Sequence, residues 1–429
     1  MRKLLHYCLF LVPLTISCTA GYESSHTPYE DEAVRRTVSL PSRSKAIQAE
    51  PVSYRIYLDN SYSMNGYFKG QTQFLSTINK LVTEMSNYAD DSRSSCKLFY
   101  INNGINYYGK TGQDRIDLFL SKINNFFGAG HKGNRGVTDL KDVLNQVIDS
   151  VSRNAVSVVI TDAVPSPGLD GQAASTYMDI LQNSLYKAVY SKLAECDFST
   201  IVIKCNSDFN GTYINQLNKG VPYSGKKRPY YILVMGNDEG AKKVAGLLKS
   251  ASGFQASYAL SNTKRNRIKS KVLVGSEYDL AGNATSLKIR RHEEGAAEMR
   301  VRLLLDLKEV AAADDYLMNP DNYVVSPAGA KLFISKVDNN GDPANRGYTH
   351  KMTVITSNMA AGQDIHVSLK YEMPQWVIES STEQDIELAE EEYEQKTLGL
   401  QYVINGLQEG YKNRRMIDSY FSLNVDVTN

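Results

Sequence analysis

The segment Tyr54–Met64 constrains the fold of this chain more than any other stretch, because a short apolar run stops there at Asp59-Asn-Ser61-Tyr-Ser63. Three oxygen-bearing side chains at alternate positions follow the end of a predicted buried strand. A loop at this point can turn all three oxygens toward one centre. Hard divalent cations such as Mg²⁺ prefer a few such oxygens and keep some of their waters. The pattern predicts a metal-assisted binding site rather than a catalytic one.

Two later segments supply further oxygen donors. Thr138 lies where the glycine-rich loop 133–136 meets an amphipathic helix, and Asp162 ends a second apolar strand. Each residue also has a simpler interpretation. Asp, Asn and Ser favour turns in general, Thr138 suits the N-cap of a helix beginning at Asp139, and Asp162 suits the end of a strand before a Pro165 turn. The metal-site hypothesis rests on all five residues occurring together and in this order.

This constellation resembles the von Willebrand factor A (vWA) family and its metal-ion-dependent adhesion site. The resemblance covers roughly residues 50–250, a length that suits one domain. It implies that one Mg²⁺ or Mn²⁺ is held by Asp59, Ser61, Ser63, Thr138 and Asp162. Two positions depart from the family pattern, since Tyr62 and Ala163 stand where the family has glycine. We expect both to crowd the rim of the site.

Residues 51–252 alternate between apolar strands and amphipathic helices, which predicts an α/β domain with a doubly wound, mostly parallel sheet covered on both faces. Ligands of such sheets bind at the carboxyl ends of the strands, where Asp59 and Asp162 are both expected. The predicted strands cover 54–58, 97–102, 105–108, 156–160, 199–204 and 230–235. The predicted helices include 116–127, 173–193 and 241–248.

Residues 253–429 change to period-two runs, which predict a β-rich, sandwich-like domain. Its Asp338–Asp342 segment suits a hairpin turn better than a Ca²⁺ loop, because the spacing and the closing Glu are missing. One terminal helix is expected from Glu383 to Asn413, opening with a solvated acidic face. A final strand is expected over Tyr420–Val427.

The beginning of the sequence suggests an envelope lipoprotein. Residues 1–17 read as a signal peptide, with a basic start and an apolar core too short to span a bilayer. Cys18 follows a small residue, as in a bacterial lipobox, and we expect it to carry the lipid anchor; an ordinary signal peptide cut nearby is the alternative. Residues 18–50 are polar and aperiodic, which predicts a flexible tether. The expected location is the bacterial cell envelope, at the outer membrane.

Several functional classes find no support in the sequence. There is no His-Glu-x-x-His or Gly-x-Ser-x-Gly motif, and the loop Gly128–Gly136 lacks the Gly-Lys-Ser/Thr ending of a phosphate-binding loop. The net charge of +1 argues against a nucleic-acid partner, and the basic clusters 226–228 and 264–271 read as solvated loops. Cys96, Cys196 and Cys205 show no zinc-site spacing. We therefore expect no enzyme activity.

The combined expectation is a metal-dependent, adhesion-type binding module anchored to the envelope. A protein partner offers an Asp or Glu carboxylate that completes the coordination sphere of Mg²⁺, and the membrane is contacted only through the lipid anchor. The alternative is a constitutive scaffold or assembly subunit of an envelope complex, in which the metal does not switch binding. Chelation separates the two, because only the first loses its partner in EDTA.

Overall fold

The computed structural model describes residues 52–111, 133–136, 138–166, 174–261, 268–282, 287–292, 298–308, 310, 312–338, 343–357 and 362–428. The predicted signal peptide, Cys18, the tether, the helix at 116–127 and most of the turn at 338–342 lie outside these ranges. Among the described residues, no helix is long and apolar enough to cross a membrane. Cys96, Cys196 and Cys205 are all free thiols.

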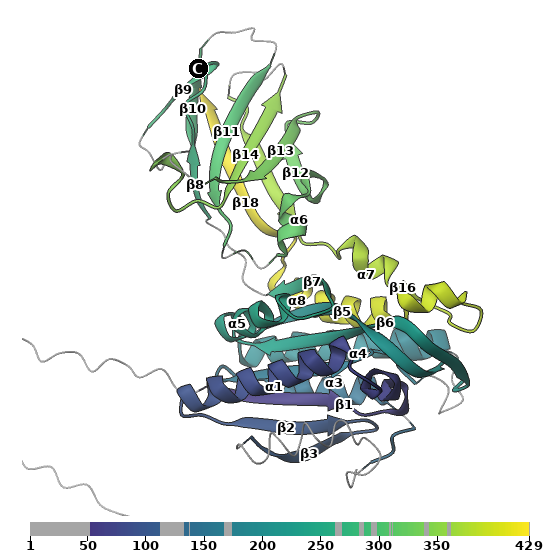
Figure 1. Ribbon diagram of the computed structural model, residues 1–429. Helices are drawn as coiled ribbons and strands as arrows, with labels where there is room; N and C mark the ends of the chain where they lie inside the picture. The colour runs from purple at the N-terminus through teal and green to yellow at the C-terminus, as the bar shows by residue number, and fades with distance from the viewer. Residues whose placement is uncertain are drawn as a thin grey trace, which may run out of the picture. The chain divides into compact units, whose positions relative to one another are not determined.

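A seven-stranded sheet organises the first half of the chain (Figure 1), and its strands lie in the order β3-β2-β1-β4-β6-β5-β7. Strand β4 is buried along its whole length and β1 along most of it, which explains their nearly continuous apolar sequences. The strand bounds are β1 Ser53–Asp59, β2 Cys96–Ile101, β3 Ile105–Lys110, β4 Ala155–Thr161, β5 Ser199–Ile214, β6 Gly220–Gly236 and β7 Phe254–Ser261.

The sheet is mixed, so the expectation of a mostly parallel sheet is wrong. Strand β1 pairs in parallel with β2 and β4. The pairs β2–β3, β4–β6, β6–β5 and β5–β7 are antiparallel. The reason is that β5 and β6 form one long hairpin, whereas the sequence suggested two short separate strands at 199–204 and 230–235. Strand β7 extends this sheet past residue 252, where the first domain was expected to end.

Helices cover both faces of the sheet, as predicted. Figure 1 shows α1 and α5 in front of the sheet and α3 and α4 behind it. One hydrophobic core contains residues of α1 and α5, and the other contains residues of α3, α4 and α8. The helix bounds are α1 Gln73–Asp91, α3 Leu140–Asp149, α4 Ala174–Glu195, α5 Asp238–Lys249 and α8 Leu400–Arg415.

Residues from 268 onward build two smaller sheets, in the orders β12-β15-β18-β10-β9 and β13-β14-β11-β8. Buried side chains alternate along β11, β14 and β15, and both sheets contribute to one core. The strands are β8 Lys269–Val272, β9 Tyr278–Leu280, β10 Lys288–Arg291, β11 Met299–Asp306, β12 Tyr323–Ser326, β13 Lys331–Lys336, β14 His350–Thr356, β15 Ile365–Lys370 and β18 Ser419–Thr428. Short helices are α6 Asp314–Met318, η2 Pro320–Asn322, η3 Pro343–Asn345 and α7 Gln375–Glu379.

The expected single helix over 383–413 is wrong in its first half. This part contains β16 (Ser381–Thr382), η4 (Glu390–Glu394) and β17 (Thr397–Leu398) instead, and only α8 is a long helix. Gly399, with φ of +69°, starts α8 in a conformation that suits glycine. Helix α8 then packs on α4 closely: a Cβ on Gly410 would lie 2.5 Å from Cβ of Val189. This late segment therefore belongs to the body of the large sheet.

Candidate metal-binding site

The carboxyl ends of the three parallel strands create the site. Leu58 of β1 lies opposite Ile160 of β4, so the next residues, Asp59 and Thr161, lie side by side. The Thr161 hydroxyl donates to Oδ2 of Asp59 at 2.7 Å, and the backbone N–H of Ser61 donates to Oδ1 at 2.9 Å. Asp59 is completely buried. Its carboxylate is thus held in one orientation at the end of the sheet.

The serines of the motif turn toward the same place. Ser61 precedes the short helix η1 (Tyr62–Phe68), and its Oγ lies 3.0 Å from Oγ of Ser63. Asp162 follows β4 and is buried, and the nearby Ser63 hydroxyl lowers the pKa of its carboxyl group. Ser63 therefore lies between Ser61 and Asp162, near both ends of the predicted donor set.

Thr138 is brought to the same cavity from the loop before α3. The N-cap of α3 is Asp139, whose side chain accepts from the N–H of Asp142, so the simpler interpretation of Thr138 as an N-cap is wrong. The backbone N–H of Asp139 donates to the carbonyl of Asn102 at the end of β2. This bond ties the Thr138 loop to the third parallel strand.

A cavity of about 310 Å³ opens over these residues. Ser61, Ser63 and Thr138 line it, whereas the buried carboxylates of Asp59 and Asp162 lie behind the lining and are joined to it by the Ser61 and Ser63 contacts. All five predicted donors thus gather at one end of the sheet. The remaining lining residues are Tyr62, Arg135, Gly136, Val164, Pro165, Ser166, Ile214, Asn215 and Asn218.

The two carboxylates make the site favourable for a cation. Burial raises the pKa of Asp59 well above its usual range, and the negative charge of Asp162 raises it further. Burial likewise raises the pKa of Asp162, while the positive charge of Arg228 opposes the increase. Two buried carboxylates together with hydroxyl oxygens are ligands that Mg²⁺ and Mn²⁺ accept. The side chains of Asp59, Ser61, Ser63, Thr138 and Asp162 fit such an ion.

Arg228 was missed at the level of the sequence, where the basic cluster 226–228 was interpreted as a solvated loop. That interpretation is wrong for Arg228, which is 1% exposed in β6. Its guanidinium lies 4.3 Å from the ring centroid of Tyr213 and donates to the carbonyl of Tyr393 at 3.3 Å. The signal that could have found it is the period-two pattern of β5, which continues through Phe209 and Tyr213 and predicts a strand partner for residues near 228.

The rim of the cavity carries a cation. Arg135 donates from Nε to the carbonyl of Asn60 at 2.6 Å and from Nη2 to the Asn65 side chain at 2.7 Å. Its guanidinium also lies 5.0 Å from the ring centroid of Tyr62, which is half exposed. Tyr62, one of the two departures from the family pattern, therefore supports a fixed positive charge at the opening.

The tip of the β5–β6 hairpin forms the wall opposite the predicted donors. Ile214, Asn215 and Asn218 line the cavity from this tip. The hairpin crosses η1 at a glycine pair, where a Cβ on Gly211 would lie 2.8 Å from Cα of Gly66. Only glycine permits this approach, which brings the tip over the site.

Ala163, the second departure, adopts φ of +54°, the left-handed region that favours glycine. The N–H of Ala163 donates to the Thr161 hydroxyl, and the N–H of Val164 donates to the Asp162 carboxylate. These bonds hold the loop in shape although its residue is not glycine.

No protein-family model matches this sequence, and no curated protein shows significant similarity to it. Within the described part of the chain, no cluster of three or more His, Cys, Asp or Glu side chains could hold a metal ion. The candidate site has a different composition, since it combines two carboxylates with three hydroxyls. Such a set suits a hard cation rather than zinc.

Proposed function

We propose that this protein is a metal-dependent, adhesion-type binding module, with a vWA-like domain followed by a sandwich-like domain, held at the cell envelope by a lipid on Cys18. The observation that carries the proposal is the gathering of five oxygen-bearing side chains at one end of the sheet: Ser61, Ser63 and Thr138 line the cavity, and the carboxylates of Asp59 and Asp162 lie behind them. A bound Mg²⁺ would supply an open coordination position for a partner carboxylate.

The shape of the site supports a protruding acidic side chain as the partner group. The three hydroxyl donors, Ser61, Ser63 and Thr138, lie within a cavity walled by the hairpin tip rather than on a flat face. Arg135 at the rim adds a positive charge that attracts a carboxylate on its approach. A partner Asp or Glu on an exposed loop can enter such a cavity, whereas a flat protein surface cannot.

The direct test measures, by calorimetry, how tightly Mg²⁺ binds to the wild-type protein and to the Asp59→Ala variant. We expect the variant to lose measurable Mg²⁺ binding, because the best-oriented carboxylate of the donor set is removed. Asp149→Ala is the matched control, since this carboxylate is exposed at the end of α3 and away from the cavity. Unchanged Mg²⁺ affinity in a folded Asp59→Ala protein would falsify the site assignment.

A second measurement separates the adhesion module from the scaffold alternative. A pull-down from solubilised envelope is performed in Mg²⁺ and again in EDTA. The adhesion module releases its partner in EDTA, and Asp59→Ala fails to capture it under either condition. A complex that survives EDTA and the substitution indicates a constitutive scaffold instead.

A further inference from the structure

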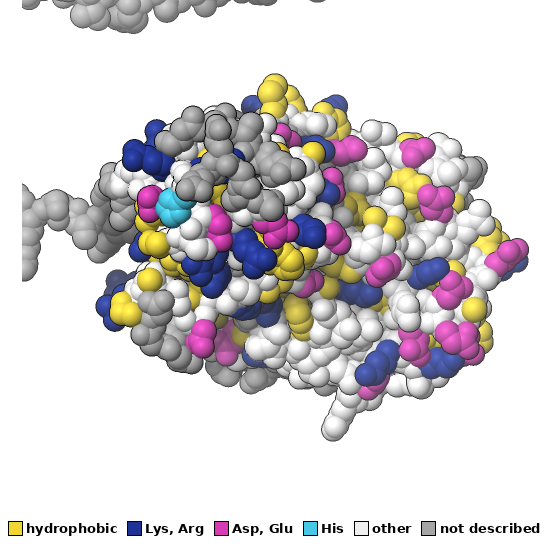
Figure 2. Space-filling model, turned by 90° about the horizontal axis from the view of Figure 1, so that it is seen from above, with side chains coloured by type: hydrophobic (Ala, Val, Ile, Leu, Met, Phe, Trp, Pro, Cys, Tyr) yellow, Lys and Arg dark blue, Asp and Glu magenta, His cyan; other side chains and the backbone are white. Residues whose placement is uncertain are grey.

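A second cavity, of about 390 Å³, lies away from the candidate metal site. It opens to the surface within the compact unit Glu50–Asn429 and is lined by α5, β5 and β7 on one side and by residues 307–308, 310 and 312–317, β13 and the start of β14 on the other. Its volume is in the range of sites that bind small organic molecules. Basic and acidic side chains are intermixed over the face drawn in Figure 2, so this face has no large patch of one charge that would attract a ligand of the opposite charge.

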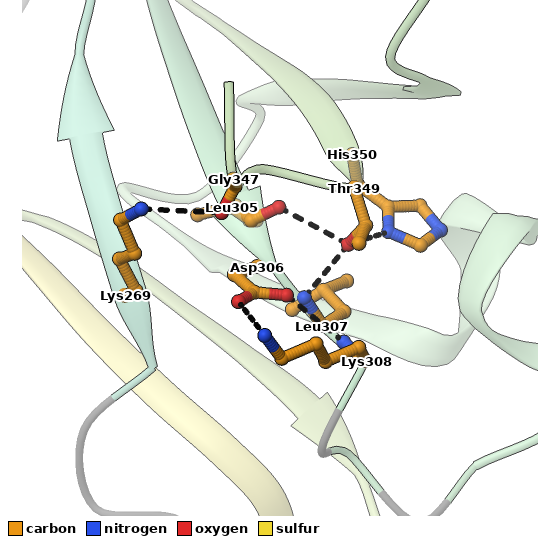
Figure 3. A network of polar contacts seen from close by, with 8 residues as sticks. All are labelled: Lys269, Leu305, Asp306, Leu307, Lys308, Gly347, Thr349 and His350. Carbon is orange, nitrogen blue, oxygen red and sulfur yellow. Dashed lines mark hydrogen bonds and ion pairs between the residues drawn. The ribbon is translucent and has the colours of Figure 1, made fainter. Parts of the chain in front are cut away.

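His350 is the most informative residue of this cavity. It is 5% exposed, and its Nε2 has no hydrogen-bond partner among the described residues. Figure 3 shows this nitrogen pointing away from Thr349, to which Nδ1 is bonded at 2.8 Å. A buried polar atom without a partner carries a free-energy penalty, which a ligand in the cavity can remove.

Thr349 holds the ring of His350 in one orientation. The Thr349 hydroxyl oxygen accepts from the N–H of Leu307 at 2.8 Å, lies 3.3 Å from the carbonyl of Leu305 and lies 2.8 Å from Nδ1 of His350. Burial lowers the pKa of His350, so the ring is neutral at neutral pH. One nitrogen of a neutral imidazole donates and the other accepts, and a ligand hydroxyl can be the partner of Nε2 in either tautomer because it can both donate and accept.

The rest of the lining is apolar with an excess of positive charge. The lining contains four lysines and two aspartates; Asp314 pairs with Lys336 at 2.9 Å, and Lys308 pairs with Asp306 beside the cavity at 3.3 Å. Lys242 and Lys249 are two turns apart and thus on one face of α5. Apolar surface comes from Ile201, Ala245, Ala259, Leu307, Val310 and Leu317.

We propose that this cavity binds a small apolar organic acid that also carries a hydroxyl group. The apolar body packs on the aliphatic wall, the carboxylate lies near Lys242 and Lys249, and the hydroxyl forms a hydrogen bond with Nε2 of His350. This ligand supplies the one partner that the buried imidazole lacks and balances the positive charge of the lining.

The test uses three probes and the full chain in lipid nanodiscs, with empty nanodiscs as the blank, because detergent would compete for the cavity. The probes are para-hydroxyphenylpropionate, phenylpropionate without the hydroxyl, and para-ethylphenol without the carboxylate. Calorimetry is expected to show the hydroxy acid binding about five- to tenfold more tightly than either of the others. Absence of binding, or equal affinity for all three probes, overturns the proposal.

Two variants identify the residues that are responsible for the tighter binding of the hydroxy acid. His350→Leu should abolish the preference for the hydroxy acid over phenylpropionate while phenylpropionate affinity is kept. The double variant Lys242→Gln, Lys249→Gln should weaken both acids about tenfold and leave para-ethylphenol unchanged. Lys331→Gln is the matched control, since Lys331 is exposed on β13 and does not line the cavity.

Two further measurements distinguish the loss of a ligand contact from misfolding of a variant and from an effect of the metal site. If His350→Leu does not fold by circular dichroism, His350→Gln takes its place, and the ratio of the affinities for the two acids must still fall. EDTA and Asp59→Ala should leave probe binding unchanged, because the cavity does not depend on the metal site. Variants that fold and bind all probes as the wild type does contradict the proposed ligand class.

Discussion

The end of the large sheet and the C-terminal segment 380–415 are both parts of one body, yet they are specified by different kinds of information. At the sheet end, local features account for much of the arrangement: Asp59 ends β1, Asp162 follows the adjacent parallel strand β4, and the backbone N–H groups two residues further on donate to both carboxylates. The C-terminal segment is held by contacts with residues far away in the sequence. Tyr231 bonds to Thr397, and Arg228 bonds to the carbonyl of Tyr393.

The floor of the site consists of the end of β1 and the loops after β1 and β4, which carry Asp59, Ser61, Ser63 and Asp162. This difference teaches that the floor and its surroundings have separate origins. The floor is what a local motif at strand ends produces. The surroundings depend on how β5–β6 and α8 are packed. Asp385, for example, is buried and accepts from the hydroxyl of Tyr213 and from the N–H of Gln216 at the hairpin. A change in the C-terminal segment should therefore reduce stability without removing a donor from the floor.

The largest effect on stability is expected from Gly410→Leu. A side chain at this position meets Val189 of α4, so α8 must move away from the sheet body. We expect the free energy of unfolding to fall by about 3 kcal/mol, measured by urea denaturation. Gly246→Ala is the control, because no atom lies within 4 Å of the added Cβ; it should stabilise α5 by up to about 1 kcal/mol. An equal loss in both variants contradicts close packing of α8 on α4.

A smaller effect is expected from pH at the floor of the site. The pKa of Asp59 is raised to about 7 in the folded protein, by burial and by Asp162. Arg135 also faces this carboxylate, and Arg228 faces Asp162. A raised folded-state pKa means that the contribution of Asp59 to stability is greatest at low pH and is lost as pH rises from about 4 to about 7.

In EDTA, the difference in unfolding free energy between wild type and Asp59→Asn should therefore change by roughly 2 kcal/mol between pH 5 and pH 8, with the wild type losing stability at the higher pH. Mg²⁺ should reverse this trend, because it stabilises the ionised carboxylate. The variant should respond weakly to both changes. Parallel pH profiles of the two proteins in EDTA contradict the raised pKa of Asp59 in the folded protein.

The comparison also explains how much could be predicted from the sequence. The strands that end at Asp59 and Thr161 were predictable because their apolar runs and the polar residues after them are local signals. The mixed sheet was not, because the hairpin β5–β6 continues through polar residues such as Asn206 and Lys227 that suggest a loop. The break in the expected helix at 383–413 was also missed, since the acidic run suggests a solvated helix face while Asp385 and Tyr393 are buried.

Residue type and order were enough to predict that Asp59, Ser61, Ser63, Thr138 and Asp162 gather at one end of the sheet, whereas the hairpin wall of the cavity and the buried counter-charge of Arg228 were not predictable. Arg228 belongs to a run of three basic residues, and nothing in that run shows that its third member points inward. Its burial follows from rings supplied by distant residues, Tyr213 and Phe209 among them. Pairing across a long hairpin determines these contacts, and a single sequence contains only an indirect signal of the pairing.

The smallest effect is expected from Ala163→Gly, which tests whether the floor of the site is strained. Ala163 has φ of +54°, a conformation that costs an L residue about 1 kcal/mol or more and costs glycine little. Glycine also gives the unfolded chain more freedom, which offsets part of the gain. We expect a net stabilisation of about 0.5 kcal/mol by urea denaturation. Ala259→Gly in β7 is the contrasting control, because its backbone is extended within the sheet and glycine there should destabilise. If Ala163→Gly destabilises as much as Ala259→Gly does, the loop after β4 is not strained, and its departure from the glycine pattern has no energetic cost.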